Sequence, residues 1–503
     1  MISHRRNRLE PVGKAGRWIR ALRTSALAAV PLALAPLALA RAIDDPRWAS
    51  AAGTTAWSIA GVSVDRAVIP ASLLRALAAL HTNVPAYSRQ TGLACSSCHY
   101  QFPQLTPFGR LFKLNGYTLT GLQTIGQPGD SAGKESLKLS PIPGIAAMVV
   151  SSFTQTAKAF PGTQNGTATY PEQFSLFAAG AITPNIGAFT QFTYASRDGS
   201  FGIDNLDIRY ANHRQLADRD LIYGLTLHNN PTVQDVWNTV PAWGFPFMTS
   251  SSAPSSIAST LIDGGLGQQV VGLGAYSLFS NILYTEFTAY RSGLQGLATP
   301  FDSTATNLSA GVIPYWRVAL QHETPSTSLM LGTFGFDARL YPEGVSGLRN
   351  HFSDVAVDAQ VEQRRGSAAW IGRASFIHER QRLSATQSAS GADNIEQSLS
   401  TTRASVAYLP NLHYSLTLGY FQTTGSSDAT LYEPAAVVGS RTGSPNTAGA
   451  MGEINYNPWQ NARVGLEYVA YNKFNGSSTA YDLTGGRNAS DNNTLYLYLW
   501  VAF

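Results

Sequence analysis

The chain ends in Thr494-Leu495-Tyr496-Leu497-Tyr498-Leu499-Trp500-Val501-Ala502-Phe503, and this stretch decides the fold. Aliphatic residues and the final phenylalanine take the odd positions from Leu495 onward, while Tyr496, Tyr498 and Trp500 take the even positions. Successive side chains of a β-strand point to opposite faces, so the stretch predicts a strand with one aliphatic face and one face of aromatic rings.

The same two-residue period recurs upstream in segments of about ten residues, separated by clusters of Gly, Pro, Asn, Asp and Ser. Val355, Val357 and Val361, for example, alternate with Asp358 and Glu362. Such segments begin near residues 147, 172, 186, 204, 219, 268, 281, 313, 327, 353, 367, 399, 413, 447, 461 and 493.

Sixteen segments are an even number, as a closed antiparallel barrel in a bacterial outer membrane requires. Closure matters there because an open sheet edge in lipid leaves backbone groups unpaired. The terminal Phe503 also resembles the assembly signal of bacterial outer-membrane proteins. We therefore predict a mainly β fold, in which residues 141–503 form a sixteen-stranded antiparallel outer-membrane β-barrel. A soluble β-sandwich or propeller is the alternative, but no fixed repeat favours a propeller.

Residues 1–42 have the pattern of a secretory signal peptide. Seven basic residues between Arg5 and Arg23 precede an apolar stretch, Ser25 to Ala40, which ends in Ala38-Leu39-Ala40. Pro31 and Pro36 interrupt the stretch, which argues against a membrane-spanning helix. We expect cleavage after Ala40 or Ala42. The formal net charge of +4 includes this basic leader, so we expect no nucleic-acid partner.

The chain has two cysteines, and both lie in Cys95-Ser96-Ser97-Cys98-His99. A C-x-x-C-H string predicts covalent attachment of a c-type haem, with Cys95 and Cys98 as the thioether residues and His99 as the proximal iron ligand. A thioredoxin-like motif would require a βαβ context, which is missing. We expect one haem c and no disulfide.

Residues 43–140 carry this motif and little β-pattern, so we expect a small, mostly helical or irregular haem domain that plugs the barrel lumen. Ser72 to His81 have the pattern of a short amphipathic helix. After the motif come five apolar residues that predict either a porphyrin pocket or the domain's own core. They are Phe102, Phe108, Leu111, Phe112 and Leu114.

Two further stretches resemble a known family. They are Val84 to Tyr117, which includes Arg89-Gln90-Thr91-Gly92 and Phe108-Gly109-Arg110-Leu111-Phe112, and Asn229 to Pro246. Both are similar to the outer-membrane cytochrome–porin fusions of iron-oxidising bacteria. The resemblance implies a single-haem cytochrome domain fused to a sixteen-stranded barrel, with Fe(II) as the electron donor.

The second axial ligand of the iron is left open by the sequence. No methionine lies between His99 and Met148, so the usual short-range Met arrangement is missing. His81 and Met148 are the candidates, and Lys113 or no protein ligand are the alternatives.

We expect the protein to oxidise extracellular Fe(II) at the haem, as an Fe(II):cytochrome oxidoreductase, and to pass the electron to a periplasmic c-type cytochrome or copper protein. The haem domain would lie in the lumen or at its periplasmic or extracellular mouth. The first alternative is a diffusion porin with a haem-bearing gating or sensing plug. The second is haem enzyme chemistry such as peroxide reduction, but the sequence shows no distal acid–base pair.

Charged residues are predicted on the lumen face of the strands. The carboxylates could attract cations, and the arginines offset their charge. The carboxylates are Asp207, Glu286, Asp358, Glu362 and Glu467, and the arginines are Arg209, Arg317, Arg373, Arg403 and Arg463.

Overall fold

A computed structural model describes residues 57–59, 62–64, 85–119, 144–195, 199–293, 308–342, 346–484 and 486–503. The chain forms two compact units, Met1–Arg75 and Ala76–Phe503. In the first unit, β1 (Trp57–Ile59) and β2 (Val62–Val64) pair as an antiparallel hairpin. The predicted signal peptide and the predicted helix from Ser72 to His81 lie outside the described residues.

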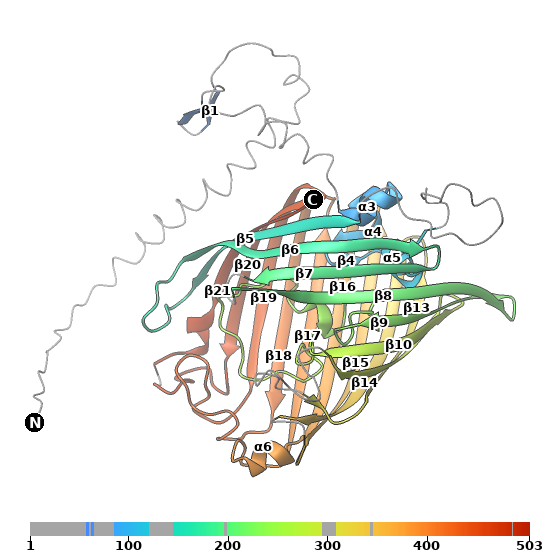
Figure 1. Cartoon of the computed structure of the whole chain (residues 1–503). Coiled ribbons are helices and arrows are strands. Elements are labelled where there is room, and N and C mark those ends of the chain that lie inside the picture. Colours follow the sequence, from blue (N-terminus) through green and yellow to red (C-terminus); the bar gives the residue numbers. More distant parts are fainter. Residues whose placement is uncertain are drawn as a thin grey trace, which may run out of the picture. The chain divides into compact units, whose positions relative to one another are not determined.

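The second unit is built on a closed antiparallel barrel (Figure 1). Each strand is hydrogen-bonded to its neighbours in sequence order, and β21 returns to pair with β5. The barrel strands are β5 (Ile145–Thr156), β6 (Thr167–Thr183), β7 (Ile186–Ala195), β8 (Ser200–Leu216), β9 (Arg219–His228), β10 (Val270–Phe279), β11 (Leu283–Ser292), β12 (Leu308–Ser309), β13 (Ile313–Glu323), β14 (Thr327–Tyr341), β15 (Asn350–Arg365), β16 (Ala368–Arg382), β17 (Glu396–Leu409), β18 (Tyr414–Gly425), β19 (Thr447–Trp459), β20 (Ala462–Lys473) and β21 (Thr494–Ala502).

The predicted sixteen-stranded barrel is confirmed. The two-residue β12 and the following β13 both pair with β14, so together they form one interrupted strand. Every observed strand begins within a few residues of a predicted segment. Period-two alternation therefore located the strands along nearly the whole barrel.

The alternation sorts side chains between lipid and lumen. On β15, Val355, Val357 and Val361 are exposed on the outer surface, while Asp358 and Glu362 are buried inside. Similar exposed apolar side chains, among them Leu273, Leu331 and Leu418, cover the outside of other strands. An apolar exterior around a polar interior is the arrangement of an outer-membrane barrel. Among the residues that the structure describes, no helix has the length and hydropathy needed to span a bilayer.

The two ends of the barrel differ in the length of their connections. At one end, seven turns of two to four residues join strands such as β6 to β7 and β19 to β20. At the other end the connections reach 41 residues, between β9 and β10. Outer-membrane barrels have short periplasmic turns and longer extracellular loops. The short-turn end is therefore the periplasmic end. Strand β5 begins at this end, and the closing strand β21 ends there.

In the part of the chain that the structure describes, three short helices precede the barrel. They are α3 (Ala86–Thr91), α4 (Cys95–Cys98) and α5 (Pro107–Leu114), with the small hairpin of β3 (His99–Gln101) and β4 (Gln104–Leu105) between the last two. The N-cap residue Thr106 accepts a hydrogen bond from Gly109 N through its hydroxyl (3.1 Å), and Pro107 fills the first turn of α5. Gly92, with φ of +69°, ends α3 in the left-handed conformation that glycine tolerates.

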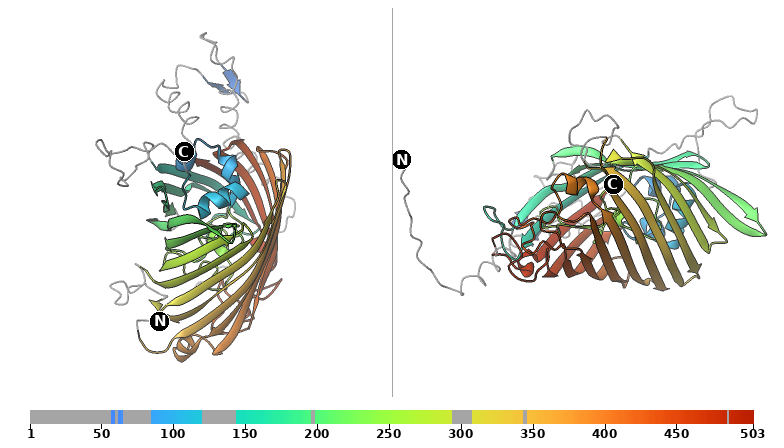
Figure 2. Two further views of the ribbon diagram at one scale, coloured as in Figure 1. Left: turned by 90° about the vertical axis from the view of Figure 1, so that its right-hand side faces the viewer. Right: turned by 90° about the horizontal axis from the view of Figure 1, so that it is seen from below.

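These helices lie inside the ring of strands, at the end where the carboxyl terminus lies (Figure 2). We call residues 85–119 the plug. Its central anchor is Arg110, which is 2% exposed and pairs with Glu362 of β15 (2.6 Å) and Glu323 of β13 (2.8 Å). On the opposite wall, the hydroxyl of Tyr117 donates to Asp207 of β8 (2.6 Å). Ion pairs and hydrogen bonds thus join the plug to several strands of the barrel.

The long connection between β9 and β10, residues 229–269, also folds inward, and we call it the inward loop. Its backbone at Ile262 donates to Asp354 Oδ2 (3.2 Å), and the side chains of Ile262 and Leu266 are buried against the barrel wall. Lys113 Nζ of the plug donates to Val233 O of this loop (2.5 Å). The inward loop therefore reaches from the extracellular end of the barrel to the plug.

Replacing Arg110 by Met should loosen the plug and leave the barrel intact. Breaking a buried ion pair by removing one partner costs roughly 3 kcal/mol or more, because a carboxylate stays buried without its counter-charge. Hydrogen exchange followed by mass spectrometry should show faster exchange in α5 and unchanged exchange in β15. Arg339→Met is the control, since Arg339 is 57% exposed. Equal protection of α5 in both variants would contradict the anchoring role.

Candidate functional site

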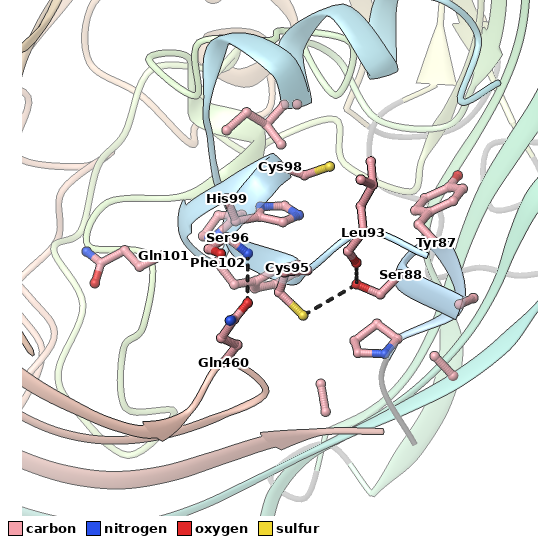
Figure 3. A pocket seen from close by; sticks show the side chains of 18 of the residues that line it. Tyr87, Ser88, Leu93, Cys95, Ser96, Cys98, His99, Gln101, Phe102 and Gln460 are labelled. Carbon is pink, nitrogen blue, oxygen red and sulfur yellow. Dashed lines mark hydrogen bonds between the residues drawn. The ribbon is translucent and has the colours of Figure 1, made fainter. Parts of the chain in front are cut away.

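Cys95 and Cys98 are the first and last residues of α4, and His99 begins β3 directly after it. Figure 3 shows both thiols and the imidazole bordering one space, which Tyr87 and Leu93 border from the other side. Both cysteines are free and partly exposed. The hydroxyl of Ser88 donates to Leu93 O (2.8 Å) and lies 3.6 Å from Cys95 Sγ. The predicted attachment residues therefore share one cavity.

Close packing of α5 on α4 fixes this motif. The Thr106 hydroxyl donates to Ser97 O (2.6 Å), and Thr106 N donates to Cys98 O (2.9 Å). Gly109 lies so close that a Cβ there would come within 2.1 Å of Cys98 O. Only glycine permits this approach of the two helices.

The cavity has about 1610 Å³ of empty space, part of which is open to solvent. Its walls are mainly apolar. They include Phe102, Leu105, Phe108 and Phe112 from the plug and Met148, Phe177, Phe189 and Trp500 from the barrel.

The cavity lies at the short-turn end of the barrel. Its lining includes residues beside a periplasmic turn and residues of the inward loop. Asn457 and Gln460, beside the turn between β19 and β20, line it from the periplasmic side. Gln460 Oε1 accepts a hydrogen bond from Ser96 N (3.0 Å). Asn238 and Trp243 line the cavity from the inward loop. One cavity therefore contacts both the periplasmic turns and a loop that enters from the extracellular end.

His99 is suited to bind iron. Burial is the largest cause that lowers the pKa of His99 to about 4, and the charges of Arg463 and Lys113 lower it further, while backbone groups of Pro103 and Gln104 oppose them. The imidazole is therefore neutral near pH 7, as metal ligation requires. Its Nδ1 is buried and makes no hydrogen bond of good geometry with the described residues.

Charge in the cavity has one sign. Lys113 and Arg463 line it, both about 5% exposed, and no Asp or Glu does among the described residues. Burial, followed by the charge of Arg209, lowers the pKa of Lys113 to about 7. An apolar cavity with two thiols, a neutral imidazole and two basic side chains fits a porphyrin, whose ring is apolar and whose two propionates are anionic. The residues present thus fit a haem c.

The candidates for the second axial ligand fall into two groups. Met148 of β5 and Lys113 of α5 both line the cavity, while His81 lies outside the described residues. Lys113 Nζ donates to Val233 O and to Asp235 O (3.3 Å). Met148 is 5% exposed and belongs to a buried cluster that includes Trp500. Phe102 packs against this cluster.

The predicted apolar pocket residues are partly corrected. Phe102, Phe108 and Phe112 line the cavity, but Leu111 and Leu114 do not. Phe108 and Phe112 are four residues apart and share one face of α5, whereas Leu114 packs with Trp237 on another face. The sequence did not reveal Asn238, Trp243 and Gln460 as cavity residues. The stretch from Asn229 to Pro246, which contains Asn238 and Trp243, resembles the family. This resemblance was the only signal, and it did not indicate where the stretch lies in the fold.

The predicted lumen charges face the lumen, where most form ion pairs. Arg317 Nη2 lies 2.6 Å from Asp358 Oδ2 and 3.5 Å from Asp235 Oδ1, and Arg209 Nε lies 2.8 Å from Asp207 Oδ2. Among the described residues, no group of three or more His, Cys, Asp or Glu side chains could hold a metal ion. These charges therefore stabilise the packed lumen.

Comparison with known proteins gives a likeness of fold. No protein-family model matches the chain, and no curated protein matches it. Several solved structures are similar, and three of them serve as examples. They are the outer-membrane channel DcaP of Acinetobacter baumannii (11% identity, 72% of this chain, 97% of that chain, TM-score 0.42), an anion-selective porin from Comamonas acidovorans (10%, 71%, 98%, 0.42) and the Salmonella typhi OmpF complex with daunomycin (10%, 73%, 98%, 0.41).

Gly109→Ala should reduce covalent haem without preventing barrel assembly. Alanine favours a helix by about 1 kcal/mol over glycine, so only the contact with Cys98 O opposes the change. Haem-stained gels measure attachment, and the mobility shift on boiling measures barrel folding. Gly202→Ala is the control, because a Cβ there meets nothing within 4 Å. Equal haem content in both variants would argue against the packing of α5 on the motif.

Proposed function

We propose that this chain is an outer-membrane electron-transfer protein that oxidises extracellular Fe(II) at one c-type haem and reduces a periplasmic c-type cytochrome or copper protein. The observation that carries the proposal is the cavity bordered by Cys95, Cys98 and His99. The periplasmic turns and the inward loop both contribute to its wall. A single redox centre must be close to both donor and acceptor, and this cavity offers such a position.

The chain's own residues hold and enclose the cofactor. Cys95 and Cys98 would form the two thioethers, and His99 would give the proximal ligand. When bound, the haem supplies one-electron redox chemistry, in which one electron from Fe(II) yields Fe(III). Phe102, Phe108 and Trp243 would present aromatic, apolar surface to the bound group.

Fe(II) is proposed as donor on two grounds. Val84 to Tyr117 and Asn229 to Pro246 resemble the iron-oxidising cytochrome–porin fusions. Ferric products are insoluble near neutral pH, so oxidation outside the cell keeps them from accumulating within it. In this proposal Fe(II) is a substrate that gives up an electron, and it needs no resident iron site in the lumen.

Stopped-flow mixing with Fe(II) tests the donor. Oxidised protein should be reduced on mixing, which the haem absorption bands report. Cys95→Ser/Cys98→Ser, which lacks both thioether positions, should show no covalent haem and no such signal. If the wild type binds haem but Fe(II) leaves it oxidised at every pH from acidic to neutral, Fe(II) is not the donor.

A diffusion porin with a haem-bearing gating or sensing plug is the second candidate. It is favoured by buried lumen atoms that have no hydrogen-bond partner among the described residues, including Arg209 Nη1 and Nη2, Arg317 Nη1 and Glu467 Oε2. Water in the lumen would satisfy such atoms. The plug and the inward loop nevertheless contact each other and the barrel wall inside the lumen, which favours electron transfer.

Proteoliposomes separate the two functions. With an electron acceptor trapped inside, the wild type should carry electrons from external Fe(II) and release little of a small trapped sugar. Arg110→Met should increase sugar release, because the plug loses its anchor. Rapid sugar release by the wild type without electron transfer would favour the porin.

A further inference from the structure

Arg463 is a buried cation that forms no ion pair with any residue the structure describes. It is the second residue of β20, directly beside the short turn that precedes this strand, and it is 5% exposed. Its Nη1 donates to Phe102 O (3.2 Å), its Nε donates to Asn457 Oδ1 (3.3 Å), and its guanidinium lies 5.6 Å from the Trp500 ring. No described carboxylate forms an ion pair with it.

One buried carboxylate of the adjacent strand has another partner. Glu453 of the adjacent strand β19 accepts a hydrogen bond from the Tyr498 hydroxyl (2.5 Å). Most other buried lumen arginines have carboxylates of their own, as Arg110 has Glu362 and Arg317 has Asp358. A buried charge is costly unless it is paired, so Arg463 lacks the partner that its location calls for.

We propose that Arg463 binds a propionate carboxylate of the haem, a role that rests on the proposed function. Arg463 lines the same cavity as Cys95, Cys98 and His99, whose described lining includes no acid. Porphyrin propionates are anionic near neutral pH, and a guanidinium can donate two parallel hydrogen bonds to a carboxylate. The ligand thus supplies the anion that the protein lacks.

Lys113 is a poorer partner for the propionate. Its ammonium already donates to the backbone oxygens of Val233 and Asp235 and lies 5.3 Å from the Trp243 ring. These contacts direct Lys113 toward the inward loop. Arg463, by contrast, is next to Asn457 and near Gln460, at the periplasmic mouth.

The location of Arg463 sets how the haem is oriented. A propionate held there places the carboxylate edge of the porphyrin at the short-turn end of the barrel. That edge then faces the side from which a periplasmic carrier would approach. The inward loop contributes a different part of the cavity wall. Arg463 is therefore a positioning residue for the cofactor and for the exit of the electron.

The first measurement is the reduction potential of the haem in detergent-purified, full-length protein. A nearby cation favours the reduced form, because reduction removes one positive charge from the iron. Arg463→Gln should therefore shift the reduction equilibrium at least tenfold toward the oxidised form, which is 59 mV for one electron. Arg214→Gln is the control, since Arg214 is exposed at the same end of the barrel.

The second measurement detects the propionate itself. Infrared redox-difference spectra of protein with isotope-labelled haem carboxyls report the carboxylate stretch. We expect this band to move in Arg463→Gln and to stay unchanged in Arg214→Gln. Arg463→Lys keeps the charge, so it should retain most of the potential but still shift the band, and it serves if the Gln variant does not assemble.

The outcomes distinguish the two proposals. Wild-type protein without covalent haem would overturn both the proposed function and the role of Arg463. Loaded haem with the same carboxylate band in all variants would overturn only the role of Arg463 and would mean that solvent holds the propionates. An equal shift of potential in Arg463→Gln and Arg214→Gln would also count against it.

Discussion

The closed hydrogen-bond ladder between β21 and β5 is the constraint on which the structure depends. In lipid no water satisfies an unpaired backbone group, so the sheet must have no free edge. Leu495 and Leu497 of β21 face outward as a result, and Tyr496, Tyr498 and Trp500 face the lumen. Closure thus creates an enclosed interior, and that interior is where buried charges, a plug and a cofactor cavity can exist.

The interior is filled by two segments that enter from opposite ends. The plug is held by ion pairs such as Arg110 with Glu362, and the inward loop is held by backbone bonds to lumen carboxylates such as Asp354. Both rely on charges that the wall presents to them. The polar lumen face of the strands, which in an open pore would be solvated, here serves as a docking surface for the chain itself.

Much of the fold could be predicted from the sequence, because lipid and lumen impose opposite preferences on alternating residues. The strand starts and the inward direction of Asp207, Arg209, Asp358 and Glu362 followed from that alternation. The proximity of Cys95, Cys98 and His99 could be predicted because the motif is local, and all three line one cavity. The cavity wall could not be predicted, since Gln460 is 364 residues from Ser96 in the chain and meets it only through barrel closure. Trp243 and Arg463 could not be predicted as cavity residues either. The position of Trp243 depends on how the inward loop folds, and that of Arg463 depends on which strand lies beside the plug.

The inward loop couples closure of the lumen to the cofactor site. Asn238 Oδ1 accepts a hydrogen bond from Leu105 N of the plug (3.1 Å), and Trp243 lines the cavity wall. A conformation that withdrew this loop to open a pore would remove both contacts and admit water to the cavity. Under the proposed function, an open pore and a well-insulated electron carrier would be competing states of the same lumen, because a haem potential depends on burial and solvent exposure. The packing of Ile262 and Leu266 against the barrel wall favours the closed state.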